Sequence, residues 1–319
     1  MRRILPLLAV AALLADCSGG SSALSSATPQ TKGLGSISFS FQTVDNPASN
    51  VNRVNGINQS NDIVGTNGSG SPSSPFVSYI SQPPYTSFQT IKYSGAQGTV
   101  AMNVTNGVSN QIIAGYVYHP PQLPGIWGLV EVNGLPTLMR DRKGGKGPAS
   151  VTVILGANDS GFGVGYYKNA SAHNAPVVVN IPTERFTALK PPAAVDAVAT
   201  GINALGDIAG FESSSSGTVA FFVQTGHYYT FSYPGSTATY AYGINTRDQV
   251  AGYYTDAGGK NHGFIITGPK GGSGQTWQAI DEPNATHGTI ATGINDNDAI
   301  CGYYVDSNNV QHGFVATPH

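Results

Sequence analysis

The sequence predicts an all-β fold built from six repeats of one unit, and three observations carry this prediction. A motif recurs that reads Gly-Ile-Asn, a polar turn, and a small apolar run ending in Gly and usually an aromatic. Its copies lie 42 to 53 residues apart, a period typical of arrayed supersecondary units. The two ends of the repeated region also complete each other. The copies begin at Gly56, Asn103, Gly156, Gly201, Gly243 and Gly293.

Each unit is expected to form four short strands. In the unit around Gly243 they are expected over 239–245, 249–256, 262–268 and the aromatic-to-Pro run 277–283. Val, Ile, Tyr, Phe and Thr fill the strands, and Gly, Asn, Asp and Ser fill the joins. Beyond the N-terminal leader, no apolar stretch of ten or more residues has a helical period, so helix should be nearly absent.

The ends of the chain favour a closed ring. The repeats begin with a fourth strand alone, over 37–47, and finish at a third strand, over 311–319. Joining them makes one whole unit and removes an open sheet edge. The sequence therefore predicts a six-bladed β-propeller of four-stranded blades over residues 35–319, closed by the N- and C-terminal strands. An open stack of β-repeats is the alternative.

The repeat resembles the bacterial extracellular HAF-repeat family. The resemblance rests on Gly-Ile-Asn paired with Gly-Tyr-Tyr, and on His-Gly-Phe at 262–264 and 312–314. It covers most of the chain after residue 35, but Trp127-Gly128 and Pro176-Val177 stand where His-Gly-Phe is expected. It implies a secreted or surface-attached β-repeat protein and brings no established reaction, so no catalytic residue follows from it.

The first residues predict export. Residues 1–16 read as a signal peptide, with two arginines before an apolar run too short to span a bilayer. Cys17 ends a sequence that resembles a bacterial lipobox, from which Asp16 departs, and 17–34 is a Ser/Gly-rich tether. We expect an outer-membrane or cell-surface lipoprotein, held in the membrane by a lipid anchor on Cys17. Ordinary cleavage, giving a periplasmic or secreted protein, is the alternative.

The composition assigns no cofactor, metal or nucleic-acid partner. The chain has 15 basic and 17 acidic residues and a net charge of −2, which does not favour nucleic acid. It lacks HExxH, G-x-S-x-G, phosphate-loop and CxxC motifs. Cys301 is expected to fill a small core site, because its equivalents in the other units are small and apolar. These are Val64, Ala114, Val164, Ala209 and Ala251.

Two repeated polar residues have competing interpretations. Asp256 and Asp306 follow Tyr pairs, and each either contributes to a Ca²⁺ site or caps its own hairpin turn. Capping is favoured, because no turn gathers three carboxylates. His262 and His312 recur at the start of the third strand, where they either share a metal or form structural hydrogen bonds, and we expect the latter.

A repeated aromatic set is expected to pack between blades, with a Tyr-lined face that stacks on sugar rings or a peptide as the alternative. Its members are Tyr116, Tyr166, Tyr167, Tyr253, Tyr254, Tyr303 and Tyr304. A basic stretch is expected to be a solvated loop or, alternatively, a contact for an anionic group such as a glycolipid phosphate. It comprises Arg140, Arg142, Lys143 and Lys146.

Together these patterns predict a non-enzymatic repeat protein, either of the cell envelope or secreted. It would act as a binding or scaffold propeller for an unknown ligand, such as an envelope glycan or protein. The alternative is a carbohydrate-active hydrolase or lyase on the same scaffold, which needs acidic side chains to converge. The acids outside the repeated turn positions are Asp141, Glu184, Asp196 and Glu282.

Overall fold

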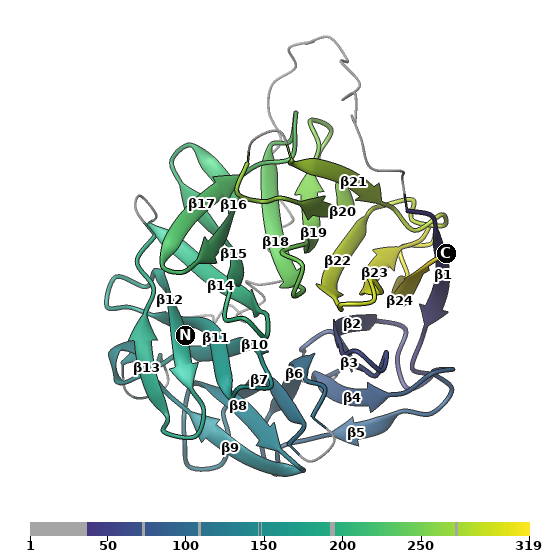
Figure 1. The fold of residues 1–319 in the computed structure, drawn as a ribbon. Helices are drawn as coiled ribbons and strands as arrows, with labels where there is room; N and C mark the ends of the chain where they lie inside the picture. Colours follow the sequence, from purple (N-terminus) through teal and green to yellow (C-terminus); the bar gives the residue numbers. More distant parts are fainter. Residues whose placement is uncertain are drawn as a thin grey trace.

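The computed structural model describes residues 37–71, 74–107, 110–145, 147, 149–191, 195–271 and 274–319. Within these ranges the chain forms 24 strands and one 3₁₀-helix, η1 (Arg142–Gly144), which confirms the prediction of a nearly helix-free fold. The strands form six blades around a central axis, as in a β-propeller (Figure 1). The signal peptide, Cys17 and the tether lie outside the described residues. The described part contains no helix long and apolar enough to cross a bilayer.

Blades 1 to 3 each use four consecutive antiparallel strands, ordered outward from the axis. Blade 1 contains β2 (Asn52–Ile57), β3 (Ile63–Asn67), β4 (Val77–Ser81) and β5 (Gln89–Ile91). Blade 2 contains β6 (Gly98–Val104), β7 (Ile112–Tyr118), β8 (Ile126–Val132) and β9 (Leu135–Met139). Blade 3 contains β10 (Thr152–Ala157), β11 (Phe162–Lys168), β12 (Asn174–Asn180) and β13 (Arg185–Ala188).

Blades 4 and 5 repeat this order and are joined by a single parallel bridge, between Thr218 and Ala238. Blade 4 contains β14 (Asp196–Ile202), β15 (Ile208–Ser214), β16 (Gly217–Gln224) and β17 (His227–Phe231). Blade 5 contains β18 (Ala238–Ile244), β19 (Val250–Thr255), β20 (Asn261–Thr267) and β21 (Thr276–Ile280). Blade 6 contains β22 (Thr289–Ile294), β23 (Ile300–Val305), β24 (Gln311–Pro318) and, as its outer strand, β1 (Phe39–Val44).

The pairing of β1 with β24 closes the ring as predicted. The two strands are antiparallel, with Phe39 opposite Pro318 and Val44 opposite Gly313. Figure 1 shows the purple first strand beside the yellow last strands. The pairing covers an edge that would otherwise expose backbone hydrogen-bonding groups. It excludes the open stack of repeats.

The two glycines of the repeat are required by close backbone approach. Each inner strand carries a bulge just before the first Gly of the motif, as between Ala241 and Gly243 in blade 5, or before Asn103 in blade 2. A Cβ atom built on Gly252, in the second strand of that blade, would lie 2.0 Å from the carbonyl oxygen of Tyr240. Any side chain there would displace the inner strand, so the Gly before the Tyr pair is needed for the sheet to form.

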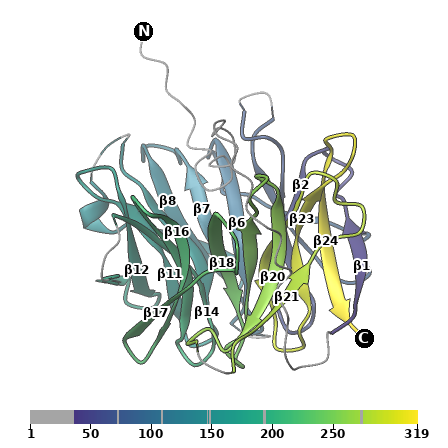
Figure 2. The ribbon, with the colours of Figure 1, turned by 90° about the horizontal axis from the view of Figure 1, so that it is seen from above.

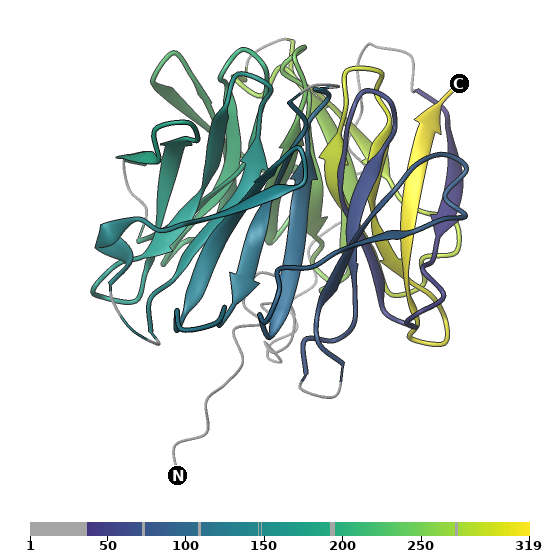
Figure 3. The same ribbon diagram turned by 90° about the horizontal axis from the view of Figure 1, so that it is seen from below.

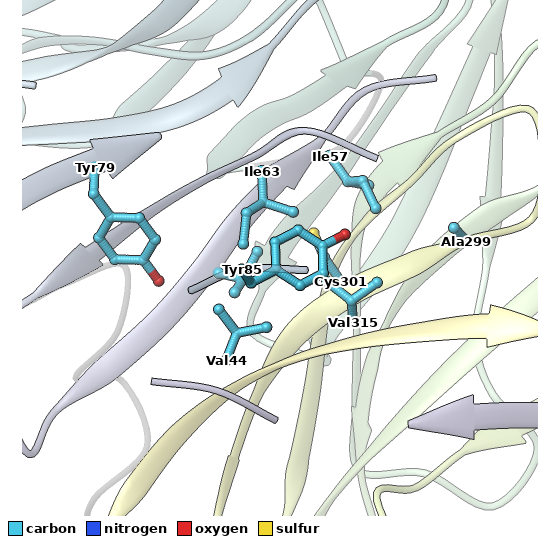
Figure 4. Close-up of a cluster of buried hydrophobic side chains, with 9 residues drawn as sticks. Val44, Ile57, Ile63, Tyr79, Tyr85, Ala299, Cys301 and Val315 are labelled. Atoms are coloured by element: carbon cyan, nitrogen blue, oxygen red, sulfur yellow. The ribbon is translucent and has the colours of Figure 1, made fainter. Parts of the chain in front are cut away.

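Apolar clusters between the blades form the core. The cluster in Figure 4 lies where the last blade meets the first, and Val44, Ile63, Tyr79, Cys301 and Val315 are among its residues. Cys301 is completely buried, and burial raises the pKa of its thiol to about 12. The prediction that this cysteine fills a core site is confirmed. All five of its equivalents in the other blades are likewise fully buried.

The ring has two different faces (Figures 2 and 3). All six inner strands run in one direction into the turn that contains Ile-Asn or its equivalent, so these turns gather on one face, called here the turn face. The connections between blades and the loops between the second and third strands gather on the opposite face, called the loop face. Residues near the start of each inner strand therefore surround the axis toward the loop face.

Candidate binding site at the centre of the ring

On the turn face, the Asn of the repeat links each blade to the next. In blade 6, Oδ1 of Asn295 accepts hydrogen bonds from the backbone N–H groups of Asn297 and Ala299, both at 3.0 Å. Its Nδ2 donates to the carbonyl oxygen of Asn58 in blade 1, at 2.8 Å. One side chain thus shapes its own turn and joins two blades. The same cross-blade bond is made by Asn58, Asn158, Asn203 and Asn245.

Blade 2 departs from this pattern but keeps the link. Thr105 stands in the Asn position, and its hydroxyl accepts a hydrogen bond from Ile112 N–H within its own turn, at 3.0 Å. The next residue, Asn106, donates from its backbone N and from Nδ2 to the carboxylate of Asp159 in blade 3, at 3.0 and 3.1 Å. Every pair of neighbouring blades is therefore hydrogen-bonded on the turn face.

The inner strands come closest at the level of the repeated Gly. A Cβ atom on Gly243 would lie 2.7 Å from the Cα atom of Gly293 in the next blade. A small cavity occupies the axis at this level and is lined by all six blades. Its polar lining residues also link blades, since the hydroxyl of Thr292 donates to the carbonyl oxygen of Val54 at 2.7 Å. This level is called here the floor, and the residues that precede it in each inner strand lie toward the loop face.

An aromatic belt surrounds the axis above this floor. In five blades, the residue after the Gly of the second strand is aromatic and pairs with the inner strand. These five residues are Tyr116, Tyr166, Phe211, Tyr253 and Tyr303, and with Tyr240 and Tyr242 of β18 they make up the belt. Tyr240 stacks on Tyr253 with ring centroids 4.6 Å apart, and Phe211 packs edge-on against Tyr240 at 5.0 Å. Four of the seven belt residues remain partly exposed: Tyr116, Phe211, Tyr240 and Tyr303.

Blade 1 is the exception and supplies a cation. There the pair is Arg53 with Thr66, and no other residue at the paired positions of this level is charged. The guanidinium carbon of Arg53 lies 5.5 Å from the ring centre of Tyr303 in blade 6 and 5.8 Å from that of Phe76. On the other side, burial raises the pKa of Tyr116 in blade 2, and the Arg53 charge opposes that rise. The cation thus lies among blades 6, 1 and 2.

The guanidinium of Arg53 has no anionic partner among the described residues. Its Nε is buried and donates no hydrogen bond, and no carboxylate contacts the group. A cation–π interaction with an aromatic face stabilises a cation by about 0.5–2 kcal/mol. A single buried donor without a hydrogen bond costs about 1–3 kcal/mol. The rings do not replace the hydrogen bond that Nε lacks, and an anion that reached the guanidinium would be stabilised.

The tyrosines of the belt contribute hydroxyl groups but no charge. Burial raises the pKa values of Tyr242, Tyr253 and Tyr303, and for Tyr303 the Arg53 charge partly opposes the rise. Their hydroxyls consequently stay protonated at neutral pH, where each can donate and accept a hydrogen bond. The belt and Arg53 together thus offer apolar ring faces, neutral hydroxyls and one cation.

The repeated Asp and His residues lie on the rim of the loop face and have structural partners. Oδ1 of Asp306 accepts the N–H groups of Asn308 and Val310 at 2.8 Å, which confirms the predicted turn cap. Nδ1 of His312 lies 2.6 Å from a carboxylate oxygen of Asp45. Blade 5 repeats this cap and pair with Asp256, His262 and Asp281. Within the described ranges, no group of three or more His, Cys, Asp or Glu is arranged to hold a metal.

The two residues of each Tyr pair have different environments. The first belongs to the belt, and the second packs outward between blades. Tyr254, the second of its pair, stacks on Tyr233 from the connection after blade 4, with ring centroids 3.6 Å apart. Tyr304 lies beside His312 and lines an open groove with Asn284. Inter-blade packing is therefore confirmed for the second residue, and also for Tyr166 and Tyr253, which belong to the belt and are buried against the next blade.

The four acids considered for hydrolysis lie in separate connections. Asp141 caps η1, and Asp196 begins β14. Glu282 is buried between blades 5 and 6, and Glu184 lies in the turn between β12 and β13 on the turn face. None of the four lines the axial cavity. The structure does not bring them together into one carboxylate pair.

The basic stretch forms a connection between blades 2 and 3. The guanidinium of Arg140 lies 4.5 Å from the centre of the Trp127 ring. Arg142 and Lys143, both in η1, are exposed to solvent. Lys146 lies outside the described residues. The described part of the stretch therefore matches the predicted solvated loop.

Sequence reasoning missed Arg53 and the linking role of the repeated Asn. The Asn recurs in five copies, so its repetition was a usable signal. Arg53 occurs in one blade only, three residues before the motif, and becomes visible only when the blades are aligned by strand register.

No family model and no curated protein matches the chain. Similar solved structures are propellers. TolB from Acinetobacter baumannii has a TM-score of 0.50 at 9% identity, over 83% of this chain and 64% of that one. A mutant of AofleA from Arthrobotrys oligospora has a TM-score of 0.49 at 12% identity, over 89% and 88%. YCF48 from Cyanidioschyzon merolae has a TM-score of 0.42 at 9% identity, over 88% and 98%. The chain thus spans less than two thirds of the TolB chain, and at such identities the likeness concerns the fold.

Proposed function

We propose that this protein is a non-catalytic binding propeller of the bacterial cell envelope, which holds its ligand at the loop-face end of the central axis. The observation that carries the proposal is the unpaired Arg53 within the aromatic belt. Aromatic faces, neutral hydroxyls and one cation can recognise a ligand, and the belt contains no pair of carboxylates of the kind that glycoside hydrolysis uses. The separation of the four candidate acids gives the hydrolase alternative no geometric support.

The envelope address rests on the leader and the resemblance to HAF repeats. A lipid on Cys17 would anchor the chain, and the tether would let the ring stand clear of the membrane. Mass spectrometry of the mature N-terminus tests this. Acylated Cys17 is the expected result, and an unmodified N-terminus at another residue would favour the periplasmic or secreted alternative.

The binding function is tested by probing glycan and envelope-protein arrays with the full chain, purified from membranes in detergent. A Tyr240→Ala variant removes one ring of the belt, and Tyr229→Ala removes a ring from the outer strand β17 as the control. We expect specific binding that Tyr240→Ala weakens and Tyr229→Ala retains. Absence of any bound array member, or equal binding by both variants, contradicts the proposal.

A further inference from the structure

We propose that Arg53 and the aromatic belt bind the carboxylate of an acidic sugar, such as a uronic acid at the end of a glycan. This inference rests on the proposed function and names the class of ligand. The two features that carry it are the unpaired guanidinium and the belt of tyrosines around it.

The position of Arg53 is suited to a ligand on the axis. Its charge lies between Tyr303 of blade 6 and Tyr116 of blade 2, so that an anion there would contact three blades at once. Both tyrosines and Arg53 are only partly buried, so the group is not sealed within the core. Below it, the close approach of the inner strands at Gly243 and Gly293 leaves little room, which favours the end of a chain over its middle.

The charge pattern selects a carboxylate. A guanidinium presents paired N–H donors that match the two oxygens of a carboxylate. No acidic residue occupies the paired positions of this level, so an ammonium group carried by the same ligand would have no counter-charge. This disfavours zwitterionic amino acids and basic peptides.

The belt favours a sugar ring as the carrier of that carboxylate. Tyrosine faces pack against the apolar faces of a pyranose, and their hydroxyls exchange hydrogen bonds with sugar hydroxyls.

The experiment compares matched ligands on the full chain. The probes are the methyl glycosides of glucuronate, galacturonate and mannuronate, each beside its neutral methyl hexoside, with affinities measured by NMR titration. We expect the affinity for each bound uronate to exceed that for its neutral partner by about tenfold or more, because the neutral sugar lacks the carboxylate that forms the charge-assisted hydrogen bond. The preference should shrink as salt is raised.

Three variants locate the effect. Arg53→Gln should lower the affinity for each uronate to that for its neutral partner. Arg53→Lys should retain only part of the preference for uronates, because lysine keeps the charge but lacks the paired N–H donors of the guanidinium. Arg185→Gln removes an equal charge from the exposed start of β13 and should change nothing. Thermal unfolding of each variant checks that it is folded. If Arg53→Gln does not fold, the reduced preference of Arg53→Lys and the comparison of matched ligands on the unsubstituted protein still test the role of Arg53.

The outcomes separate the two proposals. Equal binding of acidic and neutral sugars, or a uronate preference that survives Arg53→Gln, overturns this inference and leaves the binding function standing. Tighter binding of acetyl-dipeptide carboxylates than of any uronate overturns the assignment to sugars. No binding of any probe overturns the inference, and the arrays described above then decide the proposed function by themselves.

Discussion

The side-chain amide of Asn295 donates a 2.8 Å hydrogen bond to the carbonyl oxygen of Asn58, 237 residues earlier in the chain. This bond joins the last blade to the first beside the axis, on the turn face. On the outside of the same blade, β1 pairs with β24. The ring is therefore closed at both its inner and outer radius, which holds Tyr303 of blade 6 and Arg53 of blade 1 in place.

Replacing Asn295 should destabilise the ring. Asn295→Ala removes the cross-blade bond to Asn58 and the acceptor of the Asn297 and Ala299 N–H groups, the second of which is buried, so we expect a loss of about 2–4 kcal/mol in the free energy of unfolding. Urea denaturation measures it. Asn308→Ala, in an exposed turn of the same blade, is the control and should cost less than about 1 kcal/mol. Equal losses for the two variants would show that the cross-blade bond contributes nothing.

A side chain at the repeated Gly should force two inner strands apart. The Cβ atom of Gly243→Ala would lie 2.7 Å from the Cα atom of Gly293, and we expect a cost of about 1–3 kcal/mol from overpacking. Gly274→Ala is the control, because no atom lies within 4 Å of the Cβ it would add. Thermal unfolding compares the two variants. A Gly243→Ala protein as stable as the control would contradict the close approach.

The turn cap of Asp306 should make stability depend on pH. The N–H groups of Val310 and Asn308 outweigh the effect of burial and hold the pKa of Asp306 below its usual value. A lowered folded-state pKa stabilises above the unfolded pKa, near 3.9, and this stabilisation is lost as pH falls through the folded pKa. Asp306→Ala should therefore lower Tm at pH 7, and the difference from the unsubstituted protein should shrink below about pH 4.

Calorimetry from pH 7 to pH 3 checks this, and Asp256→Ala in blade 5 should behave alike, because its carboxyl pKa is also lowered. Burial alone would raise the Asp256 pKa, but the N–H of Lys260, His262 and the N–H of Gly258 together outweigh it. A Tm difference that stays constant over the whole range would mean that the caps act without their charge.

The ring could be predicted from the sequence because its determinants repeat. Every blade must satisfy the same backbone geometry, and three sequence features indicate it: the Gly-Ile-Asn turns, the Gly before the Tyr pairs and the complementary chain ends. The outer strand β9 was harder, because its unit lacks the aromatic-to-Pro landmark and pairing with β8 alone defines it. The tyrosines of the candidate site were predicted only as the alternative to inter-blade packing. Arg53 could not be predicted, since it occurs in blade 1 only and its place is defined by tyrosines of blades 2 and 6. The signal peptide, the lipid anchor on Cys17 and the tether remain predictions.

The closure of the ring is tested most directly by a disulfide between β1 and β24. Ser40 lies opposite Thr317 in the register, and both are exposed. Antiparallel partners bring their Cβ atoms within reach of a disulfide. In the double variant Ser40→Cys, Thr317→Cys, mass spectrometry of peptides from the monomer should show a nearly complete disulfide joining these two strands. Pairing Ser40→Cys with Ser307→Cys should not. Failure of the first pair to link, or links only between molecules, would contradict the closed six-bladed ring.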